Sequence, residues 1–399
     1  MRRTGPSTGP PPSRGGPVER ADRGSRAPTT GTAPPGAVLL VIDSLDGGGA
    51  ERYVVDLAIA LRGRGWPVEV ACSTGGVRAG ALTDAGIPVS VLLGGLVKRR
   101  VSGGYGRALR RLVRDRRPAV VHAHLYASAA AAVVATRGLS VPVVLTEHTE
   151  APWRDRAARA ISRRVYQRVD HVVAVSSAIR DTLVGTYGVP AGRVDLLLPA
   201  TAAPAAAPRR ATGGTAATIG VVGRLVPEKG VDVFLRAVAL VSAVVPAARF
   251  VVVGDGPLRA ALEDRAVSLG LAGVVTFTGF RPDAPQLIAG LDVLVVPSRS
   301  DGSPLVVCEA MAAGIPVVAS RVGGLPDLVA HGVSGLLVRP EDPADLARSL
   351  VRLLRDPAAA QALGRRGRQL AEVRSHARLV DRMTEVYAAV ARSAAPALA

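Results

Sequence analysis

The sequence predicts an α/β protein built from two Rossmann-like, doubly wound parallel-sheet domains that face each other across a cleft. Three observations support this prediction. Short apolar runs alternate with helical segments along most of the 399 residues, which is typical of parallel sheets covered by helices. A stretch rich in Pro, Ala and Gly interrupts this alternation at residues 199–216. The alternation then starts again, so each half can form a sheet of its own.

Shifts in composition set the expected domain bounds. Residues 1–36 are rich in Pro, Gly, Ser, Thr and Arg without hydrophobic periodicity, which predicts a disordered tail. The N-terminal domain is then expected over residues 37–198, the linker over 199–216 and the C-terminal domain over 217–375. Residues 376–399 are expected to form a helix that packs back towards the N-terminal domain.

Each half contains a series of predicted strands. In the first half they are Ala37–Ile42, Val68–Cys72, Val89–Leu93, Ala119–His124, Val141–Thr146 and His171–Val175. In the second half they are Ala217–Val222, Arg249–Val253, Val274–Phe280, Asp292–Val296 and Pro316–Ala319. Helices fill the intervals, and two amphipathic helices are expected at Pro343–Arg355 and His376–Arg392.

Two acids lie on one strand–turn–helix unit of the second half. The apolar strand Val293–Val296 runs into a turn that carries Asp301, and Pro304 suits the first turn of a helix that carries Glu309. Ligands of open α/β sheets lie outside the carboxyl ends of the strands. A carboxylate there can accept hydrogen bonds from two vicinal sugar hydroxyls. The alternative is that Asp301 caps a turn and Glu309 is a solvated helix acid.

Histidines follow two predicted strands of the first half. His122 and His124 end one strand and point to the same side, because residues two apart share a face. His148 ends the next strand along the chain. These imidazoles at the carboxyl edge indicate a pocket. A metal site and satisfied structural histidines are the alternatives, but no matching third ligand cluster is evident in the sequence.

Two turns have the composition of phosphate-binding loops. Gly48 and Gly49 lie between the first strand and a helix N-terminus, where backbone N–H groups can cradle a phosphate. This turn lacks the G-x-G-x-x-G pattern, so it is not a classical dinucleotide site. The first turn of the second half carries Arg224 and Lys229, a pair of cations suited to a diphosphate. The alternative is that these two are surface cations on a loop.

The net charge of +18 suggests an anionic partner. The basic residues are mostly Arg and are densest at residues 98–117. Nucleic acid, anionic lipid or a phosphorylated substrate could use such a surface, but no basic-aromatic RNA motif or zinc-finger spacing is present, so no specific nucleic acid is expected. A solvated Arg-rich helix remains the alternative to membrane docking.

Localisation follows from what the sequence lacks. No apolar run approaches the roughly 20 residues of a membrane span, and the basic N-terminus has no apolar core of a signal peptide. Cys72 and Cys308 both fall in apolar segments and fit small core residues. We therefore expect a cytoplasmic protein, with peripheral docking at the inner face of the membrane as a further hypothesis.

Taken together, these segments resemble the retaining GT-B glycosyltransferases of family 4. The matching segments are GGGAERYVVDLA from Gly47, HAH at His122, TEH at Thr146, GRLVPEKG from Gly223, GDGP from Gly254 and SDGSPLVVCEAMAAGIPVVAS from Ser300. They occur in the order of the family and span about residues 38–340.

The resemblance implies hexosyl transfer with retention, without a metal, from a UDP- or GDP-type nucleotide sugar to an acceptor hydroxyl. The acceptor is a glycan, a lipid-linked molecule or a small molecule, on the side of the N-terminal domain. No cofactor is implied besides the nucleotide-sugar substrate, which the C-terminal domain would bind. The alternatives are a GT-B sugar-nucleotide epimerase and a non-catalytic sugar-nucleotide-binding protein.

The resemblance also implies roles for residues of the N-terminal domain. Gly48 and Gly49 match the loop that approaches the donor phosphate. His124 matches the histidine that faces the transferred sugar, and His122 matches it less closely. His148 lies where the family has another polar residue of the cleft.

In the C-terminal domain, Arg224 and Lys229 match the diphosphate clamp. Asp301 matches the acid that faces the sugar hydroxyls, and Glu309 matches the acid that holds the ribose. Further donor-binding residues are expected at Gly302, Ser303, Pro304 and Leu305. The sequence departs from the family twice, because Asp301 replaces the usual Glu and Pro-Ala-Thr at 199–201 replaces the usual Pro-Asn-Gly before the linker.

Overall fold

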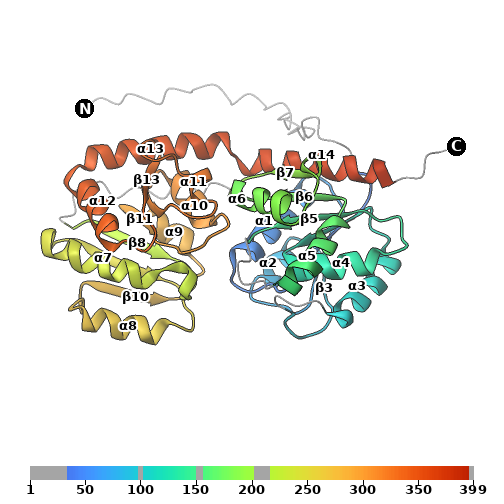
Figure 1. The fold of residues 1–399 in the computed structure, drawn as a ribbon, viewed down its shortest axis with the longest axis horizontal. Helices are drawn as coiled ribbons and strands as arrows, with labels where there is room; N and C mark the ends of the chain where they lie inside the picture. Colours follow the sequence, from blue (N-terminus) through green and yellow to red (C-terminus); the bar gives the residue numbers. More distant parts are fainter. Residues whose placement is uncertain (1–33, 98–101, 150–155, 202–215, 395–399) are drawn as a thin grey trace, which may run out of the picture. The chain divides into compact units, whose positions relative to one another are not determined.

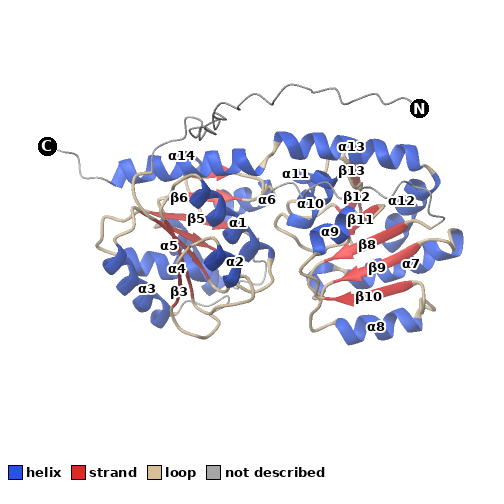
Figure 2. Cartoon of the chain, turned by 180° about the vertical axis from the view of Figure 1, so that it is seen from behind, coloured by secondary structure: helices blue, strands red, loops and turns tan. Residues whose placement is uncertain are grey.

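The computed structural model describes residues 34–97, 102–149, 156–201 and 216–394 (Figure 1). The expected disordered tail lies outside these residues apart from 34–36, and so does most of the expected linker. Two parallel sheets organise the chain, with helices on both faces of each sheet (Figure 2). This arrangement confirms the predicted fold class.

The first sheet has seven strands in the order β3-β2-β1-β4-β5-β6-β7, all parallel. The strands are β1 Val38–Ile42, β2 Val68–Cys72, β3 Val89–Val91, β4 Val120–His124, β5 Val143–Glu147, β6 His171–Ala174 and β7 Val194–Leu196. The helices are α1 Gly49–Gly63, α2 Ala79–Asp84, α3 Gly103–Arg116, α4 Tyr126–Thr136, α5 Arg156–Gln167 and α6 Ser177–Asp181, followed by the π-helical turn Thr182–Thr186 and the 3₁₀ turn Ala191–Arg193.

The second sheet has six parallel strands in the order β10-β9-β8-β11-β12-β13. The strands are β8 Thr218–Val222, β9 Arg249–Val253, β10 Val275–Gly279, β11 Val293–Val296, β12 Val317–Ser320 and β13 Gly335–Val338. The helices are the 3₁₀ turn Pro227–Lys229, α7 Val231–Val244, α8 Arg259–Ser268, α9 Ala284–Ala289, α10 Leu305–Ala313, α11 Leu325–Leu328, α12 Pro343–Arg355, α13 Pro357–Val373 and α14 His376–Ala394.

Each sheet is buried on both faces, which explains its near-continuous apolar strands. Residues of α1 and α14 pack against one face of the first sheet, and residues of α3 and α4 against the other. In the second sheet, α7 and α12 cover one face and α10 covers the other. Val, Leu and Ala build most of these cores, as the low aromatic content requires.

Helix α14 follows α13 of the C-terminal domain and packs against α1 and β4 of the first sheet. Its attachment is both apolar and polar. Arg64 Nη1 on the N-terminal domain lies 2.6 Å from the carboxylate of Asp381, and Arg382 Nη2 lies 2.9 Å from that of Asp195. The C-terminal helix is therefore structurally a part of the first domain.

Polar contacts also join loops and helices of the two sheets. The carboxylate of Asp327 on α11 accepts hydrogen bonds from the backbone N–H and the hydroxyl of Ser177, at 2.6 and 2.9 Å. The thiol of Cys308 on α10 donates to the carbonyl of Pro199 at 3.2 Å. These contacts bring α6 to α11, and the end of the first domain to α10.

Three elements lie outside the predicted pattern. Strand β7 has three residues, too few to show a hydrophobic period of its own, and β13 begins at a glycine, which weakens the strand signal. Helix α13 was not predicted, and it contains Gly364 and Gly367, which lower helix propensity. An added Cβ at Gly364 would overlap the carbonyl oxygen of Gly314, so close packing against the end of α10 accounts for this glycine.

Substitution of Gly230 tests whether the first turn of the second sheet packs closely against the chain after β11. Its φ is +62°, and a Cβ there would overlap the carbonyl oxygen of Pro297 after β11. Gly230→Ala should lower the free energy of unfolding by about 2–4 kcal/mol, through left-handed strain and overlap together. The matched control is Gly270→Ala, which has φ +71° but no neighbouring atom within 4 Å and should cost about 1 kcal/mol. Urea unfolding measures both, and equal losses would contradict the close approach.

Candidate functional site

Several predicted site residues follow the strands at which the strand order of each sheet changes direction. In the first sheet the order reverses between β1 and β4; Gly48 and Gly49 follow β1, and His124 ends β4. In the second sheet it reverses between β8 and β11; Lys229 follows β8 and Asp301 follows β11. Open α/β sheets bind ligands at such switch points, outside the carboxyl ends of the strands.

Asp301 meets Lys229 across the second switch point. The two strands that carry them, β8 and β11, are direct neighbours. Lys229 Nζ donates to Asp301 Oδ2 at 2.5 Å, and the hydroxyl of Ser298 donates to the same oxygen at 3.1 Å. The turn after β8 thus places a cation beside the carboxylate of the turn after β11.

Glu309 is almost fully buried on α10, and Arg52 on α1 forms an ion pair with it. Burial raises the pKa of Glu309 to about 7, and the Arg52 guanidinium offsets part of that rise. The acid of one domain therefore receives its counter-charge from the helix that follows the glycine turn of the other domain.

The backbone around Gly302 leaves no space for a side chain. A Cβ on Gly302 would overlap the carbonyl oxygen of His148, and a Cβ on Gly324 would overlap that of Gly302. Next to it, the hydroxyl of Ser303 is buried without a hydrogen-bond partner among the described residues. Leu305 at the start of α10 packs into the core of the first domain. The backbone of the turn before α10 therefore lies in close contact with the loop that follows β5.

Arg224 and Lys229 differ in their surroundings. The side chain of Arg224 is exposed and, within the part of the chain that the structure describes, makes no hydrogen bond or ion pair. The turn Pro227–Lys229 is held by another arginine, Arg299. Arg299 pairs with both carboxylate oxygens of Asp232 at 2.8 Å. Arg299 also donates to the carbonyl of Pro227 at 2.8 Å. Arg299 therefore fixes the turn that carries Lys229.

The three predicted histidines form one cluster, in which His122 and His124 are buried and His148 is partly exposed. The ring centroids of His122 and His124 lie 4.1 Å apart, and His124 Nδ1 lies 3.2 Å from His148 Nε2. Burial lowers the pKa of His122 and of His148 to about 3, and it lowers the pKa of His124 well below its usual value. All three rings are thus neutral near pH 7. His124 Nε2 has no hydrogen-bond partner among the described residues.

Helix α1 begins at Gly49 with Gly48 as its N-cap, and no side chain caps it. The first N–H groups of such a helix have no intrahelical partner and favour an anion. A Cβ on Gly48 would overlap the carboxylate of Glu51, whereas Gly49 has open space around it. The turn can therefore admit a ligand closely at Gly49.

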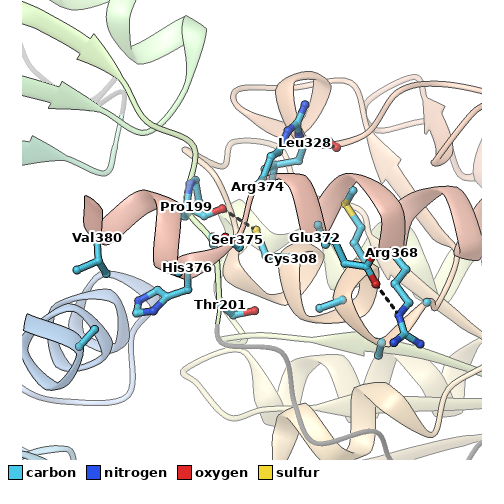
Figure 3. Close-up of a pocket in the computed structure, with 18 of the residues that line it drawn as sticks. Pro199, Thr201, Cys308, Leu328, Arg368, Glu372, Arg374, Ser375, His376 and Val380 are labelled. Atoms are coloured by element: carbon cyan, nitrogen blue, oxygen red, sulfur yellow. Dashed lines mark hydrogen bonds and ion pairs between the residues drawn. The ribbon is translucent and has the colours of Figure 1, made fainter. Parts of the chain in front are cut away.

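A cavity of about 820 Å³ lies elsewhere, at the far end of α10 (Figure 3). Gly314 after α10, Thr201 and the junction of α13 and α14 at Ser375 and His376 line it. The predicted site residues are not among its lining residues. No group of three or more His, Cys, Asp or Glu side chains suited to a metal ion occurs in the described ranges.

Comparison with known proteins identifies the family. Residues 47–200 match the model described as Glycosyltransferase Family 4, and residues 216–356 match that described as Glycosyl transferases group 1. D-inositol 3-phosphate glycosyltransferase of Rhodococcus opacus is 33% identical over 392 residues, covering 86% of each chain. The chain belongs to glycosyltransferase family 4. The resemblance found in the sequence is confirmed, and membership favours a transferase over an epimerase or a non-catalytic binding protein.

Further relatives of this family 4 glycosyltransferase differ in their named activities. Glycogen synthase of Mycobacterium tuberculosis is 33% identical over 281 residues, covering 66% of this chain and 67% of its own. Anabaena HepE, solved in complex with UDP-glucose, superposes with a TM-score of 0.78 at 23% identity, covering 88% of this chain and 99% of its own. This likeness shows that the family 4 chain has the GT-B fold.

Several residues of the site were not predicted from the sequence of this family 4 enzyme. Arg52, Ser298 and Arg299 have no motif that marks their partners, although Arg52 lies within the GGGAER segment that resembles the family. The pairing of Arg52 with Glu309 spans the two domains, so only the folded structure shows it. The prediction that Arg224 and Lys229 together bind a diphosphate remains a prediction; the ion pair of Lys229 with Asp301 was not foreseen.

The raised pKa of the buried Glu309 predicts how the free energy of unfolding depends on pH. Its pKa is raised in the folded state, so between about pH 4.5 and 7 the folded protein binds more protons than the unfolded one, and stability falls as the pH rises. From pH 5 to 8, the free energy of unfolding of the native enzyme should fall more than that of Glu309→Gln, by an amount on the order of 3 kcal/mol. Urea unfolding at several pH values measures this difference.

The control for this prediction is Glu372→Gln. Glu372 is an exposed glutamate on α13, so solvent screens its charge and its replacement should leave the pH dependence as in the native enzyme. Parallel pH profiles of the native enzyme and Glu309→Gln would show that Glu309 is not a proton-binding group of the folded state in this range.

Proposed function

We propose that this glycosyltransferase moves a hexose from a UDP- or GDP-type nucleotide sugar to an acceptor hydroxyl, with retention at the anomeric carbon. One observation carries the proposal: Lys229 and Asp301 meet at the switch point of the second sheet, while His124 and the glycine turn lie at that of the first. A cation for a diphosphate and a carboxylate for sugar hydroxyls are thereby neighbours. The relatives named for sugar transfer to inositol phosphate and for glycogen synthesis support the same chemistry.

In the proposed mechanism, Arg224, Lys229 and the N–H groups at the start of α1 stabilise the departing nucleoside diphosphate. Such preorganised charges act where negative charge develops and need no reorganisation during the reaction. Two cations supply the positive charge that a metal would otherwise provide, which supports a metal-independent reaction. The acceptor hydroxyl attacks from the face that the diphosphate leaves and passes its proton to the departing diphosphate oxygen, so the carbon keeps its configuration without an enzyme nucleophile.

Asp301 and Glu309 would accept hydrogen bonds from the donor. Asp301 would bind hydroxyls of the sugar, and Glu309 those of the ribose. His124 would face the transferred sugar as a neutral imidazole, because its pKa is well below the working range. Asp301 is one methylene shorter than the usual Glu, so we expect its reach to select among donor sugars. The acceptor would be a glycan, a lipid-linked molecule or a small molecule.

The diphosphate clamp is tested by removing its charges. Arg224→Ala and Lys229→Ala should each lower kcat by about 100-fold, because each removes a group that stabilises the leaving group. The measurement is sugar transfer with UDP- and GDP-sugars and an acceptor panel, together with the thermal shift produced by UDP and GDP with and without EDTA. The control is Arg265→Ala with Arg352→Ala, two exposed arginines on α8 and α12. Full transfer by the doubly substituted clamp variant would show that these roles are wrong.

We propose further that α3 of this enzyme docks on an anionic membrane surface. Among the described residues, Arg107, Arg111 and Arg114 on one side of α3 and Arg117 at its C-cap are exposed and have no ion-pair or side-chain hydrogen-bond partner. Each such residue near an anionic leaflet contributes about 1 kcal/mol. No described helix is long and apolar enough to cross a membrane.

Vesicle flotation tests this docking. The protein should float with vesicles that contain phosphatidylglycerol, and Arg107→Glu with Arg111→Glu and Arg114→Glu should lower the bound fraction by at least about tenfold at low salt. Charge reversal of Arg365, Arg366 and Arg368 on α13 is the control and should leave binding largely intact. Equal flotation with neutral vesicles would rule out the anionic surface as the partner.

A further inference from the structure

Tyr387 on the C-terminal helix α14 contacts the histidine cluster. Its hydroxyl lies 2.6 Å from His122 Nδ1, and both side chains are fully buried. On the other side of the ring, His122 Nε2 lies 2.8 Å from the hydroxyl of Thr146. The polar atoms of the His122 ring are therefore both engaged, one by α14 and one by β5.

The chemistry of these two partners favours one tautomer of His122. A neutral imidazole has one donor and one acceptor nitrogen. Burial raises the pKa of Tyr387 well above its usual value, so the phenol keeps its proton. A phenol is a stronger acid than an alcohol, which favours the tautomer in which Tyr387 donates to Nδ1 and Nε2–H of His122 donates to Thr146. The ring cannot turn over without losing both bonds.

His122 in turn packs against His124, whose ring it faces at 4.1 Å with a tilt of 40°. His148 holds the other side of His124 through Nδ1. Nε2 of His124 is the one ring nitrogen of this histidine that the described residues leave without a partner. The direction of Nε2 thus depends on the rings and bonds packed around His124.

We propose that Tyr387 is a positioning residue of the transfer reaction, which locks the His122 ring so that His124 keeps its orientation towards the transferred sugar. This inference rests on the proposed role of His124. It gives α14 a function in catalysis although Tyr387 lies 265 residues from His122 in the sequence. Tyr387 also packs against Trp66, with ring centroids 5.9 Å apart, which fixes the phenol from the other side.

The test is Tyr387→Phe, which keeps the ring and its packing but removes the hydroxyl. Its kcat should fall about tenfold, because small misplacements of groups at a reacting centre cost rate, while KM for the donor stays within about twofold because the diphosphate and ribose contacts are untouched. Thr146→Val removes the bond on the opposite side of the ring and should have the same effect. The double variant should be no slower than either single one, because both changes free the same ring.

The matched control is Tyr105→Phe. Tyr105 is also a fully buried tyrosine of this domain, but its hydroxyl donates to the backbone carbonyl of Ile42 at 2.9 Å. Loss of a buried hydrogen bond alone should lower stability in both variants, whereas kcat should fall in Tyr387→Phe alone. NMR of histidine labelled with ¹⁵N provides a readout without substrate, because the Nδ1 and Nε2 signals of His122 should change in Tyr387→Phe and not in Tyr105→Phe.

His124→Ala separates the two possible failures. Loss of transfer in His124→Ala together with full kcat in Tyr387→Phe would overturn this inference and leave the proposed function standing. Full transfer in His124→Ala would overturn the role of His124 and, with it, the role of Tyr387. Equal kcat losses in Tyr387→Phe and Tyr105→Phe would show a general effect of stability and would also overturn the inference.

Discussion

A buried carboxylate needs a counter-charge, and Glu309 receives it from Arg52 on the other domain. This ion pair places the start of α1 beside α10, and with it the glycine turn after β1 beside the acid-bearing unit after β11. The close approach is possible because Gly302 and Gly324 present bare backbone to the facing loops. The ion pair and the glycine contacts thus involve different residues around α10, and both bring the first domain close to this helix.

The fold was predictable because its signals are local. Buried parallel strands show as short apolar runs, and turns show as glycine, proline and acids at their ends. Helix α12 has the bounds expected from its periodicity, since Asp342 caps it and Pro343 begins it. Short elements such as β7 escape this method, because three residues next to a turn carry no period and gain their strand conformation from the neighbouring strand β6.

The sequence named the candidate site residues but not how they pair. Residue types and positions after strands indicated Lys229, Asp301, Glu309 and His124 as neighbours of a ligand. Their partners could not be derived, because Lys229 and Asp301 are 72 residues apart and Tyr387 and His122 are 265 apart. No local pattern relates residues at such separations. Arg299 is a further example, since its role in holding the turn of Lys229 depends on Asp232 and Pro227 meeting around one guanidinium.

The two ion pairs of the site differ in how easily a donor can replace them. Lys229 is 31% exposed and Asp301 9%, so water reaches this pair more than it reaches Glu309. Glu309 is 3% exposed, so separating it from Arg52 would leave a buried charge without compensation. A ribose that approaches Glu309 can therefore add hydrogen bonds to the carboxylate but gains little by displacing Arg52. Under the proposed function, a donor would exchange partners at Asp301, the more exposed of the two acids, while the Arg52–Glu309 pair stays in place.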